Sequence, residues 1–230
     1  MKPTSHRAVV LASGGLDSTV TAALAKQEGY ELFFLTIAYG QRHAVEVERA
    51  RQVAATLGVA HHLVMNLDLR AIGGSALTGS VAVPKDRTGI ERSRSIPVTY
   101  VPGRNLIFLS IAAAHAEAVG ASCIYFGANV VDYSGYPDCR PEFIHAFEAA
   151  VQEGTKAGRE GNPLQVKAPL LLLTKAEIIR RGLELYVPFH LTHSCYDPLE
   201  DQACGRCDSC VIRREGFATA GVVDPIAYAI

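Results

Sequence analysis

The chain has 230 residues, with 22 basic and 23 acidic side chains and a net charge of −1. This length suits one large α/β domain with a small appendage, and the balanced charge argues against a broad binding surface for nucleic acid or anionic membrane. The first apolar run meets Ser13 too early for a secretory signal, and no later run reaches the length of a membrane span. We therefore expect a cytoplasmic protein with small-molecule partners.

Apolar, β-rich runs alternate along the chain with longer stretches of helical period. The patterns predict strands near residues 7–12, 31–38, 61–66, 122–127 and 164–168, and helices near 17–28, 43–57, 104–119 and 140–154. This alternation is typical of a doubly wound α/β fold with a mainly parallel five-stranded sheet.

Two polar stretches, 68–103 and 128–141, interrupt this alternation. Ligands of such sheets bind at the carboxyl ends of the strands, so long loops there favour a functional site. The alternative is an ordinary surface loop, or disorder around residues 78–95.

The segment AVVLASGGLDSTVTAAL (residues 8–24) has the pattern of a strand, a tight turn and the start of a helix. Gly14 and Gly15 allow the backbone to approach a ligand closely, and free N–H groups at the start of a helix favour an anion. Neither GxxxxGK[ST] nor GxGxxG is present, which disfavours the common mononucleotide and dinucleotide loops. A capped turn without a ligand is the alternative.

The motif SGGLDS (residues 13–18) resembles the pyrophosphate loop of the N-type ATP pyrophosphatases, the PP-loop superfamily, which cleave ATP between the α and β phosphates. The resemblance implies that Ser13 and Ser18 hold pyrophosphate and that Asp17 helps to place Mg²⁺. Lys175, after the capping residue Thr174, is a second cationic contact or else a solvated helix residue. The implied nucleotide-binding residues of the loop are Ala12, Ser13, Gly14, Gly15, Leu16, Asp17, Ser18 and Thr19.

Four of the six cysteines, Cys195, Cys204, Cys207 and Cys210, are crowded into one short segment. The two-residue spacing lets thiolates converge on one ion, and four sulfur ligands suit a structural, tetrahedral Zn²⁺ site. An iron–sulfur cluster is the main alternative, ahead of unligated core cysteines. We expect a PP-loop domain over residues 1–190 and a small helical zinc-binding subdomain over residues 191–230.

Further motifs extend the resemblance over nearly the whole chain, from Val9 to Phe217. They are YGQRH (39–43), PGRN (102–105), GANVVDYSGYPDCRPEF (127–143), TKAEI (174–178) and CGRCDSC (204–210). Together with SGGLDS they resemble the 7-cyano-7-deazaguanine synthase (QueC) family of the queuosine and archaeosine pathways. The resemblance implies conversion of 7-carboxy-7-deazaguanine, ATP and ammonia to a nitrile, through an adenylated carboxylate, an amide and a second activation. It also implies a homodimer, and places Tyr39 and Gln41 against the adenosine.

The residues of the 127–143 segment suit a guanine-like base. A carboxylate can accept from the adjacent N–H donors on one edge of such a base, and aromatic rings can stack on its face. Arg140 or Arg104 can bind the substrate carboxylate or the α-phosphate. Edge contacts are predicted for Asp132, Asp138 and Glu142, and stacking for Tyr133, Tyr136 and Phe143. Alternatively, this is a polar loop tied down by its own hydrogen bonds.

No glutaminase domain or N-terminal catalytic cysteine is present, which implies that ammonia is supplied free or by a partner. Three other functions stay open. A tRNA-thiolation enzyme would share the pyrophosphate loop but needs RNA contacts that the balanced charge does not favour. A non-enzymatic zinc module that binds nucleotide is the second, and a relative that attaches a deazapurine to another molecule is the third.

Overall fold

The computed structural model of the protein describes residues 6–41, 45–93, 96–131 and 136–230. Its centre is a five-stranded sheet in the order β3-β2-β1-β4-β5, with every neighbouring pair parallel. Because the chain leaves β1 first toward one edge and later returns to the other, the topological switch point lies at the carboxyl end of β1. The strands are β1 (Arg7–Leu11), β2 (Glu31–Ala38), β3 (His61–Asn66), β4 (Cys123–Tyr125) and β5 (Gln165–Lys167).

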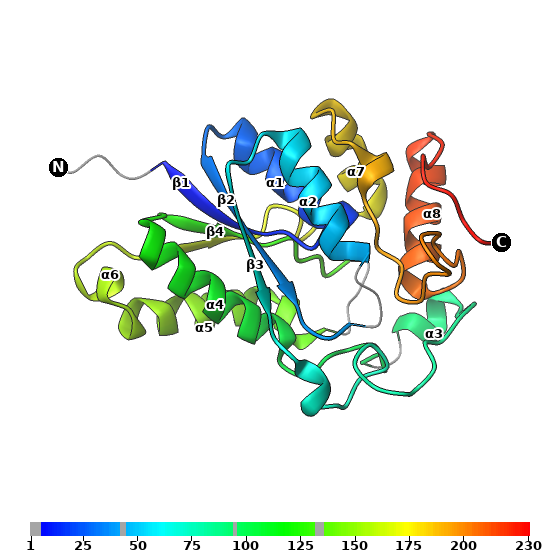
Figure 1. Cartoon of the computed structure of the whole chain (residues 1–230), viewed down its shortest axis with the longest axis horizontal. Coiled ribbons are helices and arrows are strands. Elements are labelled where there is room, and N and C mark those ends of the chain that lie inside the picture. The colour runs from blue at the N-terminus through cyan, green and yellow to red at the C-terminus, as the bar shows by residue number, and fades with distance from the viewer. Residues whose placement is uncertain (1–5, 42–44, 94–95, 132–135) are drawn as a thin grey trace.

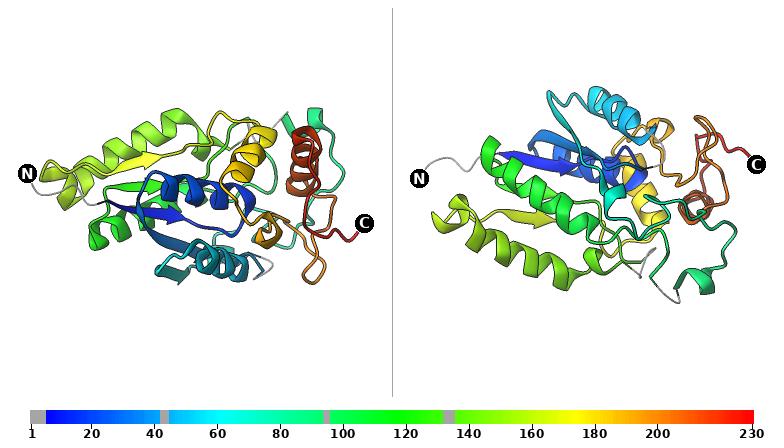
Figure 2. Two further views of the ribbon diagram at one scale, coloured as in Figure 1. Left: turned by 90° about the horizontal axis from the view of Figure 1, so that it is seen from above. Right: turned by 60° about the horizontal axis from the view of Figure 1, so that its bottom comes forward.

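Helices cover both faces of the sheet, as Figures 1 and 2 show. The longer ones are α1 (Leu16–Gln27), α2 (Val45–Leu57), α4 (Arg104–Val119), α5 (Pro141–Gly154), α7 (Lys175–Glu184) and α8 (Asp208–Ala220). Short helical turns are α3 (Gly89–Ser93), α6 (Lys156–Arg159), η1 (Leu69–Ala71), η2 (Pro137–Cys139) and η3 (Phe189–Leu191).

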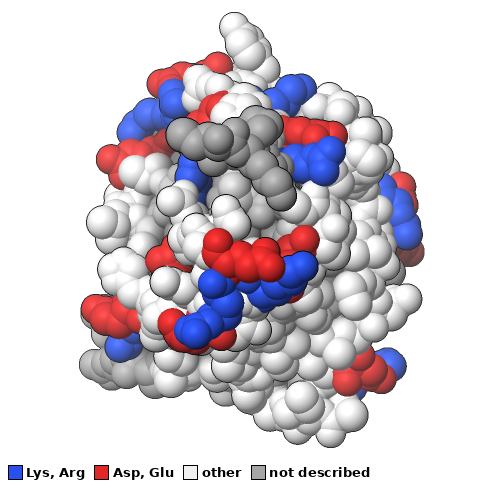
Figure 3. Space-filling view, turned by 90° about the vertical axis from the view of Figure 1, so that its left-hand side faces the viewer, with Lys and Arg blue, Asp and Glu red and all other residues white. Residues whose placement is uncertain are grey.

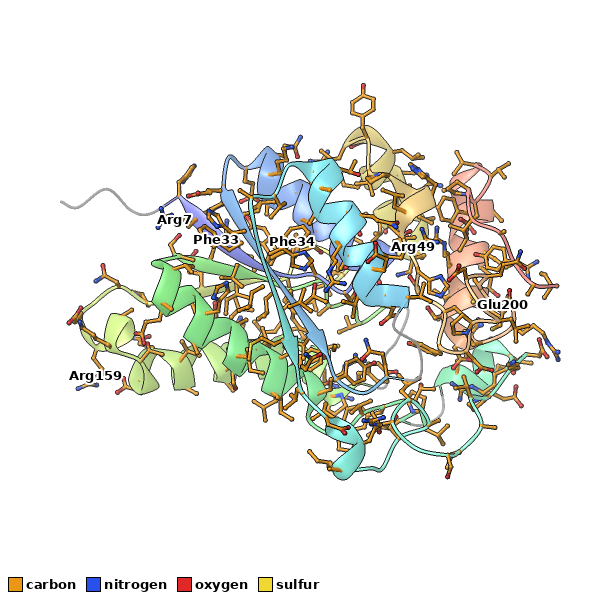
Figure 4. All side chains as sticks on the ribbon, in the orientation of Figure 1. Arg7, Phe33, Phe34, Arg49, Arg159 and Glu200 are labelled. Atoms are coloured by element: carbon orange, nitrogen blue, oxygen red, sulfur yellow. The ribbon has the colours of Figure 1, made fainter. Side chains whose placement is uncertain are left out.

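Alternation along the central strands assigns neighbouring side chains to opposite layers. Phe33 packs with α4 and α5, whereas Phe34 packs with α1 and α2; Figure 4 labels both rings on β2. A third apolar cluster joins α1, α7 and α8, and includes Val20, Ile179 and Phe217. Among the described residues, the helices therefore pack through three apolar clusters, two of which include residues of the sheet.

The strand and helix predictions are confirmed, with tested boundaries shifted by no more than two residues. Residues 43 and 44, at the start of the helix predicted over 43–57, lie outside the described residues. Segment 68–103 is more than a surface loop, because Leu77, Val83 and Val101 are buried in the main core. The division at residue 190 stays a prediction, since Phe217 shares its cluster with residues of α1 and α7.

Charge is mixed on the face shown in Figure 3, where acidic and basic side chains lie next to one another. Within the described parts of the chain, no helix is both long and apolar enough to cross a membrane.

Candidate active site

The glycine turn lies at the switch point, between the end of β1 and the start of α1. Gly14 has a φ of +79°, in the left-handed region that favours glycine. A Cβ on Gly14 would lie 2.4 Å from the carbonyl oxygen of Glu46 and 2.7 Å from the amide nitrogen of Ala50. The turn therefore passes directly against α2, and only glycine permits this approach.

Serine hydroxyls are hydrogen-bonded to backbone amides of the turn. Ser18 Oγ accepts from the Ser13 amide at 3.2 Å and lies 3.1 Å from Ser13 Oγ. The Gly15 amide donates to Ser13 Oγ at 3.3 Å, and the Leu16 amide donates to Ser194 Oγ at 3.3 Å. These hydroxyls and amides converge at the start of α1, where the free N–H groups and the helix dipole favour an anion.

A lysine from a second helix faces this turn. Lys175 Nζ lies 2.6 Å and 2.8 Å from the two carboxylate oxygens of Asp17. Lys175 is the first residue of α7, whose start is fixed by a reciprocal capping box between Thr174 and Glu177. The starts of α1 and α7 therefore meet at this point, and the lysine charge there is balanced by the carboxylate of Asp17.

A cavity of about 270 Å³ connects the turn with the other site segments. Its walls come from the carboxyl ends of β1, β2 and β4, the start of α4, the 136–139 segment and the cysteine segment. Among the residues predicted from the sequence, those in the lining are Ala12, Ser13, Gly15, Leu16, Asp17, Ser18, Tyr39, Gln41, Arg104, Tyr136, Lys175 and the predicted metal ligand Cys195. Gly14 and Thr19, predicted to bind nucleotide, are not in the lining; the Thr19 hydroxyl donates to the Gly15 carbonyl oxygen at 2.8 Å.

The lining of the cavity also includes an arginine, a tyrosine and a carboxyl group, from Arg104, Tyr39 and Glu46. The guanidinium of Arg104 lies 5.7 Å from the centre of the Tyr39 ring. Burial raises the pKa of Tyr39, so the phenol stays neutral. Burial also raises the pKa of Glu46 to about 7, against the attraction of Arg104. Glu46 was not predicted as a site residue; its signal in the sequence is only its position soon after YGQRH.

The 136–139 segment places a buried carboxylate beside the cavity. Asp138 Oδ2 accepts from the Asn105 amide at 3.0 Å, while Asp138 Oδ1 is buried without a hydrogen-bond partner among the described residues. Asn105 Nδ2 donates to Cys139 Sγ at 3.3 Å. Burial raises the pKa of the Cys139 thiol to about 12, which keeps it protonated. Tyr136 lines the cavity, with its hydroxyl 3.2 Å from that of Thr99.

The other predicted substrate contacts among the described residues do not line the cavity, although Asp138 adjoins the lining residue Cys139. Arg140 and Glu142 are exposed, and neither they nor Asp138 and Phe143 belong to the lining of the cavity. The Phe143 ring packs 6.2 Å from that of Phe147. Asp132 and Tyr133 lie outside the described residues. The roles of all these side chains stay predictions.

The four clustered cysteines are buried, and their sulfur atoms lie within 4.8 Å of one another. Backbone amides surround the sulfurs: Cys204 N donates to Cys195 Sγ at 3.2 Å, and Cys207 N donates to Cys204 Sγ at 3.3 Å. Hydrogen bonds from Cys195 and Cys210 lower the pKa of Cys207. Four converging sulfurs that accept amide hydrogen bonds are a donor set that fits one metal ion.

A glycine turn at the switch point of a parallel sheet, faced by a lysine at a second helix start, defines a PP-loop ATP pyrophosphatase. Solved structures of the same fold include the NMN synthetase from Francisella tularensis, with a TM-score of 0.52 and 17% identity over 96% of this chain and 79% of that one. A 4-thiouridine synthetase in complex with RNA and ATP has a TM-score of 0.53 and 20% identity, over 96% of this chain and 47% of that one. At these identities the likeness concerns the fold alone.

The family follows from closer relatives. Residues 7–221 match the family described as queuosine biosynthesis protein QueC. A 7-cyano-7-deazaguanine synthase from Myxococcus xanthus is 60% identical over 223 residues, 96% of this chain and 97% of the relative. One from Syntrophus aciditrophicus is 59% identical over 221 residues, 95% of this chain and 96% of the relative. The chain belongs to the QueC family.

Proposed function

We propose that this protein converts 7-carboxy-7-deazaguanine and ammonia to 7-cyano-7-deazaguanine, with cleavage of ATP to AMP and pyrophosphate. Family membership supports the reaction, since the relatives just described are named for its product. The observation that carries the proposal is the shared cavity, which joins the Ser13–Ser18 turn to Tyr136 and Cys139. An acid bound near Tyr136 would therefore face the phosphates of ATP bound at the turn.

In the first step, a carboxylate oxygen of the substrate attacks the α-phosphorus, and the bond to the bridging oxygen of the β-phosphate breaks. The hydroxyls of Ser13 and Ser18 and the amides at the start of α1 bind the pyrophosphate that leaves. Lys175 supplies a cation beside it. Mg²⁺, held by Asp17 and the phosphates, would neutralise further charge on the leaving group. This chemistry rests mainly on positioning and on charge stabilisation.

Ammonia then attacks the adenylated carboxyl carbon, and AMP leaves with formation of the amide and release of a proton. The amide oxygen attacks the α-phosphorus of a second ATP, which again releases pyrophosphate. Loss of AMP and of the two remaining nitrogen-bound protons gives the nitrile. Arg104 is suited to bind the α-phosphate or the substrate carboxylate, because its guanidinium lines the same cavity as the turn.

Recognition of the base is assigned to the 132–143 segment. Asp138 Oδ1 is a buried acceptor without a protein partner among the described residues, which suits the N–H donors on the edge of a deazaguanine. Tyr136 offers an aromatic face in the cavity. The remaining proposed contacts are Asp132, Tyr133, Arg140, Glu142 and Phe143.

We assign a structural Zn²⁺ to the four-cysteine site. A closed shell of four protein sulfurs leaves no position for substrate and matches structural zinc. The assignment is tested by elemental analysis of protein purified without oxygen, with about one zinc per chain expected for a single four-ligand site. Stoichiometric iron with a visible chromophore would replace zinc by an iron–sulfur cluster.

The family resemblance supports a homodimer, and the net charge of −1 supports a protein that binds no nucleic acid directly. A cytoplasmic location is part of the same proposal. Light scattering coupled to size-exclusion chromatography tests the assembly, with a mass of twice the 24.6 kDa chain expected. A monomer at working concentration would overturn the dimer.

The reaction is tested by incubating the protein with 7-carboxy-7-deazaguanine, Mg-ATP and an ammonium salt. Mass spectrometry should detect the nitrile and AMP, and a coupled assay should detect pyrophosphate. ADP as the nucleotide product, or an absolute need for glutamine, would contradict the proposal. A Ser13→Ala, Ser18→Ala double variant is the matched blank, because it removes the hydroxyls of the turn and leaves the zinc site intact.

A further inference from the structure

Helix α8 belongs to both the cysteine site and the wall of the cavity. Cys207 is its N-cap, and Cys210 lies in its first turn. Ser209, Ile212 and Arg213, from its first two turns, line the cavity. Figure 1 shows α8 beside α7 at one end of the molecule. Any displacement of α8 at the cysteines would therefore reach the active site.

Gly216 lies in the middle of α8, and it is the point at which α8 touches Lys175. A Cβ on Gly216 would lie 2.4 Å from Lys175 Cγ, 2.9 Å from Lys175 Cβ and 3.0 Å from Ile179 Cδ1. The φ of Gly216 is not positive, so the backbone does not require glycine there. Glycine in a helix interior costs about 1 kcal/mol relative to alanine. We attribute the glycine at this position to the lysine side chain, which occupies the space that a Cβ would need.

The position of α8 is fixed on the N-terminal side of this contact. Gly216 lies six positions after Cys210, or about 9 Å along the helix. Arg213, between them, is buried and donates to the carbonyl oxygens of Thr192 and Phe189. The same guanidinium pairs with Asp224 at 2.8 Å and 2.9 Å. Because α8 is anchored in this way and the nearest atoms are Cγ and Cβ of the lysine, a methyl group at Gly216 would displace Lys175, with the start of α7, rather than α8.

We propose that Gly216 is a positioning residue for Lys175, and that α8 couples the four-cysteine site to the ammonium group that faces Asp17. The contact seats the alkyl chain of Lys175 so that Nζ reaches the first turn of α1. The consequence for ATP rests on the proposed role of Lys175 at the phosphates. The contact and its coupling to the cysteines do not depend on the reaction.

The first test measures the chemical reactivity of Lys175 in the zinc-loaded protein. Gly216→Ala should raise the acetylation rate of Lys175 by about fivefold or more under a limiting amine-reactive reagent, because a displaced ammonium loses its carboxylate partner and its burial. Lys167 serves as the internal standard and should not change. The control variant is Gly154→Ala, because an added Cβ at this helical glycine has no heavy atom within 4 Å. Equal Lys175 rates in the two variants would overturn the positioning role.

The second test is a double-mutant cycle on ATP affinity. Gly216→Ala should weaken ATP binding about tenfold in the parent protein, equal to about 1.4 kcal/mol. In the Lys175→Ala background the same change should cost less than about twofold, because residues that act through one another are not additive. An equal loss in both backgrounds would mean that Gly216 acts on the fold and not through the lysine.

The third test uses the wild-type chain, so it holds even where Gly216→Ala fails to fold. Chelation of the metal should raise the acetylation rate of Lys175 while that of Lys167 stays constant. Unchanged reactivity of Lys175 after metal loss would overturn the coupling. If the protein shows this coupling but forms no nitrile, the proposed function is contradicted and the positioning role of Gly216 is not.

Discussion

Lys175 and Asp17 join the first turns of α7 and α1, with Lys175 Nζ bound to both carboxylate oxygens at 2.6 Å and 2.8 Å. The pair is largely shielded, since the lysine side chain is 11% exposed and that of the aspartate 32% exposed. The cation is thus held in place before any phosphate arrives. Such preorganisation lowers the cost of stabilising the charge that develops on a leaving group.

Replacing Lys175 by methionine should lower kcat by about a hundredfold or more, the usual cost of removing one electrostatic contact to the transition state. Methionine keeps much of the packing against Gly216 and removes only the charge. The rate of pyrophosphate release measures the effect.

Lys167→Met is the matched control, because Lys167 also holds an ion pair, with Glu28 at 2.7 Å, and does not line the cavity. It should lower the melting temperature and leave kcat unchanged. Equal loss of kcat in both variants would show that Lys175 serves the fold and not the reaction.

Segment 85–87 is fastened to the cysteine segment by ion pairs of different burial. Arg87 Nε lies 3.1 Å from Asp208, whose side chain is almost fully buried. Arg206 pairs with Asp86 at the surface. Arg87→Met should destabilise the protein by about 3 to 5 kcal/mol, because it leaves a buried carboxylate without its partner. Arg206→Met should cost less than about 1 kcal/mol. Urea unfolding of zinc-loaded protein gives both free energies of unfolding. Similar losses in the two variants would contradict the view that the buried ion pair contributes more to stability than the exposed one.

The sheet was predictable because its strands are continuous apolar runs and its helices have clear periods. The turn was predictable because all of its residues are neighbours in the sequence, within the six-residue motif SGGLDS. The cysteine site was predictable from spacing for the same reason. These features depend on neighbours in sequence, and the structure places them as expected.

Other contacts join residues that are far apart in the sequence, and a single sequence does not indicate which of them meet in the fold. Nothing near Gly216 in the chain indicates Lys175, which lies 41 positions earlier and on another helix. Glu46 has the ordinary pattern of an acidic residue in a first helical turn, and only the closure of the cavity around it changes its titration. Similarly, the three consecutive charges of segment 85–87 resemble a solvated loop until the cysteine segment folds over them.

Asp138→Asn should raise the KM for 7-carboxy-7-deazaguanine by about tenfold to a hundredfold, because a hydrogen bond to a charged group contributes about 1.5 to 3 kcal/mol. Asparagine can still accept from the Asn105 amide and so preserve the start of α4. The KM for ATP should not change. Steady-state kinetics with each substrate varied in turn measure both constants. Glu153→Gln, at an exposed position on α5, is the control. Parallel increases in the two constants would point to a general distortion of the site.

Glu46→Gln should stabilise the protein at neutral and alkaline pH and have little effect in acid. The carboxyl pKa rises from its ordinary 4.5 to about 7 in the folded state, through burial. Below pH 4.5 both states hold the proton. Between pH 4.5 and 7 the unfolded chain releases it and the folded chain keeps it, so this group lowers stability as pH rises, and the penalty is complete above pH 7.

Glutamine carries no such penalty, so the variant should gain about 1 to 3 kcal/mol above pH 7 and lose this advantage toward pH 4.5. Urea unfolding of the parent and the variant across this pH range gives the difference directly. Glu48→Gln, at an exposed position on the same helix, should change stability by less than about 0.5 kcal/mol at any pH. A gain for Glu46→Gln that does not vary with pH would mean that the side chain destabilises the fold by its shape and not by its charge.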